Sequence, residues 1–399
     1  MMLLAAVILA AAAQVELRGG EAAPAGEIVL VDAAGVHLSA SSPDGRPAER
    51  KGTEVVVIGW DRVRGLGSER KAEWQKFADV ADKSWRARTR LERGDFIAAE
   101  PAFEELFSKY RGQAGPTAEV VSEGLLRCRL RRAAHVAAVE PWLGMVRATA
   151  GQATFLHPNW SSQAGMTSVL DEATGLVPAL PPIWLGWPSV DVLARSGLSG
   201  WGEGGQSAAK AGALAEIYVQ AARYEAGMPA TLPELATNDP GVGIAWHIVQ
   251  SRIGSVSQRA EARKELLARV TPGGAAWQAP APWLEAWCRA AIGRSLVREE
   301  ALEQRRLGVV ELLSVPARFS GAHPYLAGMA LAEASVTLRS MGDVEGSEVL
   351  ARELASLYPT HPVNDWALIR AIAPAKSAGP VNKPAPAKEG AVEEGVSTR

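Results

Sequence analysis

The chain has 399 residues, of which 47% are hydrophobic and 22% charged, a balance that is typical of globular proteins. Its 42 basic and 44 acidic residues leave a formal net charge of -2, so the whole chain carries no field that would attract nucleic acid or an anionic membrane. The length allows two or three domains, and partners have to be sought in local patches.

The first residues predict export. Leu3 to Ala13 is an uninterrupted apolar run that ends in three alanines, the small-residue pattern at which signal peptides are cleaved. The run is shorter than the roughly 20 residues of a membrane-spanning helix. We therefore expect residues 1–13 to be a signal peptide and the protein to be periplasmic or secreted, without a membrane span after cleavage. Because no Lys or Arg precedes the run, tethering by an uncleaved signal is the alternative.

Residues 14–66 are predicted to form a small β domain. Short runs with period-two alternation are separated there by clusters of Gly, Pro and Asp. The runs are VELRG, EIVLVD, GVHLSA and TEVVVIGW. They predict a small barrel or curled sheet, and Gly26 before one strand and the hairpin that follows it resemble the SH3-like and Sm-like small barrels.

Helical periodicity extends over residues 67–373. It opens with two apolar stripes at steps of three and four, separated by Gly94-Asp95, which predicts a helical hairpin. The stripes are Trp74, Phe77, Ala78, Ala81 and Trp85, then Phe96, Ala99, Phe103, Leu106 and Tyr110. We expect these two stripes to face each other. Pro116 starts a further helix, because proline costs no hydrogen bond in a first helical turn, and the next helix covers HVAAVEPWLGMVRA.

The helical pattern is interrupted at residues 151–205. Five prolines there exclude one continuous helix, and four tryptophans argue against solvated disorder. We expect an ordered, extended loop packed on the helices. Residues 374–399 hold almost no large apolar side chain and are predicted to be a disordered tail.

The last predicted helix pair resembles a tetratricopeptide repeat. Small residues that allow close helix approach, a Gly-Asp turn and a closing proline stand at the spacing of that family. The matching positions are Leu331, Ala334, Ser335, Leu338, Gly342, Asp343, Ser347, Ala351, Leu354 and Pro359. The opening hairpin matches only in its second half, since Arg86 and Arg90 stand where the family has apolar residues. No constant period joins the two units, so the predicted fold is mainly α, an irregular helical-hairpin array preceded by a small β-barrel-like domain.

Two surfaces are candidate binding sites. Arginines at the opening hairpin and the helix after Pro116 would form a cationic, partner-binding face if the helices are adjacent, although acidic neighbours offer ordinary ion pairing. Its residues are Arg86, Arg90, Arg93, Arg129 and Arg132. The alternative is a carbohydrate-binding or hydrolytic site in the interruption, since an exposed indole is a good platform for a sugar and a histidine near carboxylates suits acid–base chemistry. Its residues are Trp160, Trp184, Trp187, Trp201 and His157, with Asp171 and Glu172 as acidic partners.

The sequence contains no HExxH, GxSxG, P-loop or EF-hand motif, so we expect no metal and no cofactor. Cys128 and Cys288 have no metal or redox spacing; we expect them to be buried thiols, with a disulfide as the alternative in an exported protein. The leading hypothesis is therefore a non-enzymatic, exported scaffold that binds a protein or peptide on its helices. No nucleic-acid partner is expected, and the oligomeric state stays open.

Overall fold

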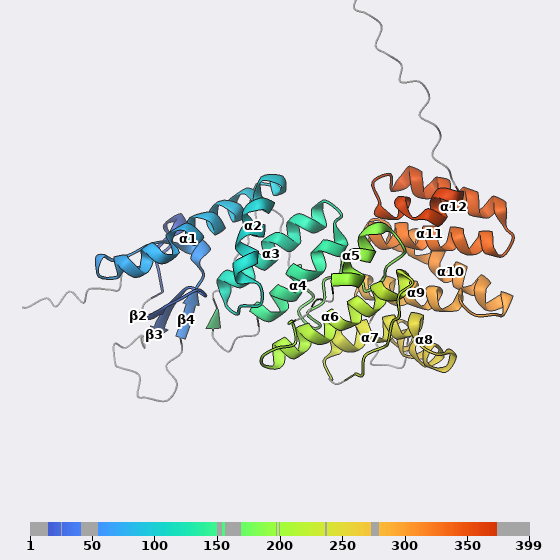
Figure 1. Ribbon diagram of the computed structural model, residues 1–399, viewed down its shortest axis with the longest axis horizontal. Helices are drawn as coiled ribbons and strands as arrows, with labels where there is room; N and C mark the ends of the chain where they lie inside the picture. The colour runs from blue at the N-terminus through green and yellow to red at the C-terminus, as the bar shows by residue number, and fades with distance from the viewer. Residues whose placement is uncertain are drawn as a thin grey trace, which may run out of the picture.

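The computed structural model describes residues 15–24, 26–40, 55–149, 154–155, 169–196, 198, 200–235, 238–272 and 279–372. Figure 1 shows the elements following one another along the longest axis, with the strands at one end and the last helices at the other. The predicted signal peptide and tail lie outside the described residues. Within the described ranges, no helix combines the length and the apolarity that a membrane crossing requires.

Strands occupy the N-terminal region, as predicted. They are β1 (Val15–Leu17), β2 (Gly26–Val31), β3 (Val36–Ala40), β4 (Val55–Ile58), β5 (Val63–Leu66) and β6 (Thr154–Phe155). β1 pairs with β5, and a second sheet has the order β2-β3-β4-β6. The described strands thus form two small sheets instead of one closed barrel. β6 comes from the interruption at 151–205 and runs parallel to β4, a pairing that local periodicity did not predict.

The remainder of the described chain is mainly helical. The helices are α1 (Lys71–Glu92), α2 (Phe96–Tyr110), α3 (Pro116–Arg131), α4 (His135–Ala148), α5 (Pro188–Ser196), α6 (Gln206–Glu225), α7 (Pro240–Ile253), α8 (Val256–Val270), α9 (Pro282–Leu296), α10 (Leu302–Phe319), α11 (Pro324–Ser340), α12 (Val344–Leu357) and α13 (Ala367–Ile372), with a 3-10 turn η5 (Pro362–Asp365) before α13. Most helices pack on the one that follows, from α1 on α2 to α11 on α12. The mainly helical array behind a small β region is therefore confirmed.

The two hairpins with repeat-like residues have the predicted turns. Gly94 has a φ of 82°, which favours glycine, and the Asp95 side chain accepts a backbone N–H of α2. Asp343 caps α12 in the same way. Between α11 and α12, the Ser335 hydroxyl donates to the Ser347 carbonyl oxygen at 2.8 Å. Small residues thus bring these two helices together as expected.

The partner predicted for the stripe on α1 was wrong. Trp74 and Phe77 pack into the core of the β region, and Trp85 is 38% exposed. Ala87 and Leu91 instead join the helical core. The reason is length: α1 has 22 residues and α2 has 15, so the first half of α1 extends past α2 and covers the strands. The stripe on α2 is buried at Ala99, Phe103, Leu106 and Tyr110, as predicted.

Trp60 and Asp61 join the β region to the helices. The Trp60 ring stacks on Phe77 of α1 with centroids 4.7 Å apart, and its backbone N–H donates to the Thr117 hydroxyl of α3 at 3.0 Å. The buried Asp61 carboxylate accepts from Arg88 of α1 at 2.6 Å. Burial raises the pKa of Asp61, against the effect of Arg88. The β region and the first helices therefore share one interface.

Candidate functional site

Residues 174–187, from the interruption between α4 and α6, run between helices α4, α6 and α9. Side chains of these helices donate hydrogen bonds to carbonyl oxygens of the segment: Trp142 to Gly175 at 3.1 Å, Lys210 to Thr174 at 2.9 Å, Tyr218 to Leu180 at 2.6 Å, Trp287 to Pro178 at 3.0 Å and Arg294 to Trp184 at 2.8 Å. Most residues of the segment are buried. The chain thus occupies this face of its own helices, which is not free to bind a partner.

The predicted ordered loop is confirmed for this segment, but two details differ. Residues Pro188–Ser196 form helix α5, because Pro188 stands at its first turn, where proline is tolerated. Trp184, Trp187 and Trp201 are at most 3% exposed, so their indole faces are covered by protein and present no platform to a sugar. Trp160 and His157 lie outside the described residues.

The carboxylates named for a hydrolytic site are not arranged for acid–base chemistry. Asp171 accepts hydrogen bonds from the backbone N–H and the hydroxyl of Thr174, at 3.0 and 2.7 Å, and so caps its own turn. Glu172 is exposed beside it. Neither carboxylate contacts a histidine among the described residues.

The predicted arginine face is largely neutralised by nearby acids. Arg129 and Arg132 both pair with Glu100, and Arg132 does so at 2.7 Å. Arg86 lies 3.5 Å from an aspartate one helical turn earlier, and Arg90 donates to a backbone carbonyl across the hairpin turn. Arg93 is exposed. Paired surface charges of this kind give little net attraction for an anion.

Two hollows lie at the edge of the helical array, on either side of His135. The first, which we name the His323 pocket, has a volume of about 340 Å³. It is enclosed by the α3–α4 turn, the buried segment, the start of α11 and the loop after α12. Its residues are Leu130, Ala133, His135, Pro178, Ala179, Pro181, Ala322, His323, Pro324, Tyr325, Leu326, Leu357, Tyr358, Pro359, Thr360 and His361. The second, the Val192 pocket, has about 380 Å³ and lies between α4 and α5.

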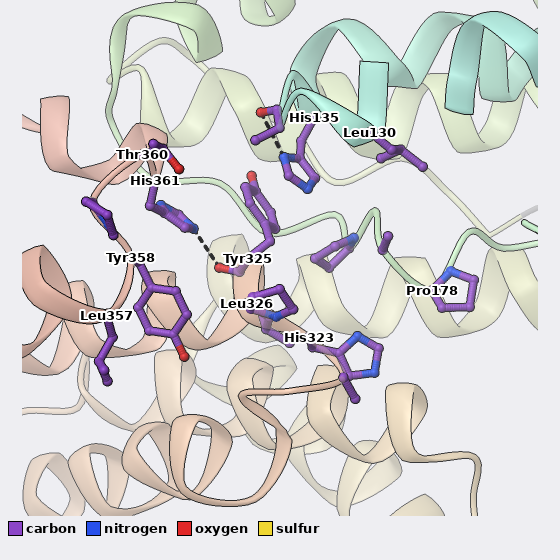
Figure 2. A pocket seen from close by; sticks show the side chains of 16 residues that line it. Leu130, His135, Pro178, His323, Tyr325, Leu326, Leu357, Tyr358, Thr360 and His361 are labelled. Carbon is purple, nitrogen blue, oxygen red and sulfur yellow. Dashed lines mark hydrogen bonds between the residues drawn. The ribbon is translucent and has the colours of Figure 1, made fainter. Parts of the chain in front are cut away.

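A stack of three rings forms the wall of the His323 pocket (Figure 2). The centroids of His135 and Tyr325 are 3.5 Å apart with planes at 17°, and those of Tyr325 and His361 are 5.1 Å apart at 21°. These rings come from α4, α11 and the loop after α12, which are distant in sequence. The stack therefore ties the middle of the array to its last hairpin.

Hydrogen bonds fix the tautomers of the two stacked imidazoles. Nδ1 of His135 donates to the Ala133 carbonyl at 3.0 Å, which leaves its Nε2 as an acceptor. Nε2 of His361 donates to the Tyr325 carbonyl at 2.8 Å, and its Nδ1 accepts from the Val363 N–H at 3.1 Å. His361 is thus held as a neutral imidazole, because one ring nitrogen donates and the other accepts.

Two backbone features make room for this stack. Ala133 has a φ of 57°, a left-handed conformation that ends α3 and directs His135 toward α11. Gly328 faces the His361 ring, where a Cβ would lie 2.6 Å from the ring atom Cδ2. A side chain at position 328 would therefore displace His361.

The pocket carries no charge at neutral pH. Burial lowers the pKa of His135 and of His361 from 6.5 to about 4. Burial also lowers the pKa of His323. None of the 16 lining residues is a carboxylate, so no acid can orient or charge these imidazoles. Among the described residues, no three His, Cys, Asp or Glu side chains are placed to hold a metal ion. The chemistry offered is apolar contact with a few neutral hydrogen-bonding groups.

A buried ionic cluster lies among helices α6, α7, α9 and α11. Arg294 of α9 contacts Glu225 of α6 at 2.8 Å and Glu333 of α11, while Arg252 of α7 contacts the same two carboxylates at 2.8 and 2.9 Å. Burial alone would raise the pKa of Glu225, but the two arginines lower it below 4.5. The cluster joins four helices close to the buried segment, whose Trp184 carbonyl Arg294 also holds.

None of the residues of the His323 pocket was predicted as a site. Arg129, from the predicted arginine face, lines the neighbouring Val192 pocket. The sequence feature that could have indicated this pocket is the position of its three histidines. His323 and His361 each precede a proline at the start of a helical turn, and His135 begins α4. Residues at helix starts adjoin surface loops, and such loops often carry binding residues.

Comparisons with family models, with curated proteins and with solved structures find no match to this chain, so the candidate site is argued from its own geometry.

Proposed function

We propose that this protein is a non-enzymatic, exported binding scaffold, which holds a peptide segment of a protein partner at the edge of its helical array. Two observations together carry the proposal. Residues 174–187 cover the face that α4, α6 and α9 share, whereas the His323 pocket is open, apolar and uncharged. Its volume of about 340 Å³ is near the lower end of ligand pockets, which measure roughly 300–1,000 Å³. The pocket suits one or two apolar side chains.

The polar groups in this pocket favour recognition of a backbone. The Tyr358 hydroxyl and the His323 imidazole line it and have no hydrogen-bond partner among the described residues. Neutral donors beside apolar surface fix the orientation of a ligand without attracting ions. Loops between packed helices are also where helical arrays vary and bind. Export remains part of the proposal, on the strength of the apolar N-terminal run alone.

The test is peptide selection followed by closure of the pocket. Peptides from a random display library are selected on the immobilised full chain, and their affinities are measured by fluorescence anisotropy. Ala322 is exposed and lines the pocket, so Ala322→Trp fills its mouth without entering the core. We expect at least a tenfold loss of affinity. Ala72→Trp, at an exposed position of α1, is the matched control and leaves affinity unchanged. Equal binding by both variants would refute the proposal.

A further inference from the structure

The last described helix, α13, packs on elements that contribute residues to the His323 pocket. Helix α13 packs on α11, α12 and η5, and the loop just before η5 supplies one wall of the pocket, residues 357–361. Ile372, where α13 ends, lies 11 positions after His361 in the sequence. The residues after 372 are therefore tethered to elements that form the pocket.

These following residues include a proline-rich stretch within easy reach. Residues 380–388 read PVNKPAPAK, with prolines at 380, 384 and 386. In a polyproline II conformation each residue advances about 3.1 Å, so the residues from 373 to 380 span roughly 25 Å. That is about the diameter of a small domain, and the stretch can reach a wall formed 11 residues before α13 ends.

The chemistry of the pocket matches that of such a stretch. Grooves that bind proline-rich peptides are lined by aromatic rings, between which the prolines pack. The His323 pocket offers the rings of Tyr358 and His323 together with Pro324 and Pro359. A polyproline II segment has no internal hydrogen bonds, so its carbonyl oxygens need donors. The Tyr358 hydroxyl and the His323 imidazole are such donors, without partners among the described residues.

A carboxylate near Tyr358, outside the pocket lining, suits the lysines of the stretch. Glu353 lies close enough to Tyr358 to act on its hydroxyl, and it forms no ion pair within the part of the chain that the structure describes. Lys383 and Lys388 flank the last two prolines. One of them would pair with Glu353 while the prolines occupy the pocket.

We propose that residues 380–388 occupy the His323 pocket in cis, as a tethered ligand that a protein partner must displace. The inference rests on the proposed function of the pocket. A tethered segment has an effective concentration on the order of 1 mM. If residues 380–388 bind the pocket with an intrinsic dissociation constant of about 0.1 mM, they compete with a partner peptide. The peptide then binds the full chain about tenfold more weakly than it binds a chain whose tail cannot enter the pocket.

The proposal is tested in the full chain by photo-crosslinking. Benzoylphenylalanine replaces Thr360, an exposed residue of the pocket, and mass spectrometry locates the cross-links. We expect intramolecular cross-links to residues 380–388. They should fall at least fivefold when prolines 380, 384 and 386 are all replaced by glycine, and that variant should bind the selected peptides about tenfold more tightly. The control position is Leu302, which is exposed and begins α10. Phe319, at the other end of α10, is nearer to the pocket residues in sequence, and helix rise puts Leu302 roughly 25 Å from it.

Three results would overturn the inference. They are an absence of tail cross-links from position 360, equal cross-linking from position 302, and cross-links between two chains that increase with concentration, which would make a second copy the occupant. If any of these appears while Ala322→Trp still abolishes peptide binding, the pocket is a binding site and only the tethered ligand is wrong. If the tail cross-links but no selected peptide depends on Ala322, the proposed function fails instead.

Discussion

Acidification should weaken the fold through His135 and His361, before most carboxylates are protonated. An unfolded chain takes up protons on these imidazoles near pH 6.5, whereas burial lowers their pKa to about 4 in the folded chain. Between these values the unfolded state binds more protons, so the free energy of unfolding falls as the pH falls through this window. Above pH 6.5 and below pH 4, the two imidazoles should cause no further change in the free energy of unfolding.

The size of the effect follows from the same values. The difference between 6.5 and about 4 corresponds to roughly 3 kcal/mol for one imidazole. The charge on His361 contributes to the low pKa of His135, so the two effects are not independent. Together they should remove about 3–6 kcal/mol between pH 7 and pH 4, which is a large fraction of the stability of a typical domain.

Urea denaturation followed by tryptophan fluorescence, at intervals from pH 7 to pH 4, measures this loss. His135→Phe keeps a ring on Tyr325 but removes one titrating group, so its stability should fall less steeply with pH. Ala133→Gly is the matched control: it relieves the left-handed alanine and should add about 1 kcal/mol at every pH without changing the slope. Identical slopes for His135→Phe and the parent chain would refute the reasoning.

Three further outcomes are expected. Arg294→Ala leaves two buried carboxylates without this cation and should cost about 3–5 kcal/mol in urea denaturation; a loss below 1 kcal/mol would argue against the buried cluster. Gly328→Ala places a Cβ against the stacked imidazole and should cost about 1–3 kcal/mol, whereas Gly321→Ala, with open space around it, should change little. Burial raises the pKa of Cys128 and Cys288 to about 12, so neither free thiol should react with a disulfide reagent at pH 8 until the chain is unfolded.

Local patterns predicted the elements well where one residue type has one structural use. Gly94-Asp95 marked a turn and a helix cap, and Pro116 marked a helix start, because glycine conformation, side-chain capping and the missing proline N–H act within a single turn. The same holds for the small residues of the last hairpin, such as Ser335.

The partners of these elements depended on distant parts of the chain. Trp74 and Phe77 form an apolar stripe whichever surface covers them, so periodicity could not choose between α2 and the strands. Trp184 and Trp187 have the residue type of a sugar platform, but helices that come later in the chain bury them. The His323 pocket combines loops near residues 133, 323 and 361, and no spacing in one sequence reveals that convergence.

The hydrogen bonds to residues 174–187 also bear on how the protein folds. In a regular solenoid each repeat contacts only its neighbours, and folding can spread along the chain one repeat at a time. Here Trp287 and Arg294 bond to carbonyls 109 and 110 residues earlier in the chain. Loops of that length must close before the central helices have their partners, which slows folding. The same contacts couple residues 174–187 to α9. The middle of this array should therefore melt as one cooperative unit, with a higher contact order than its hairpins suggest.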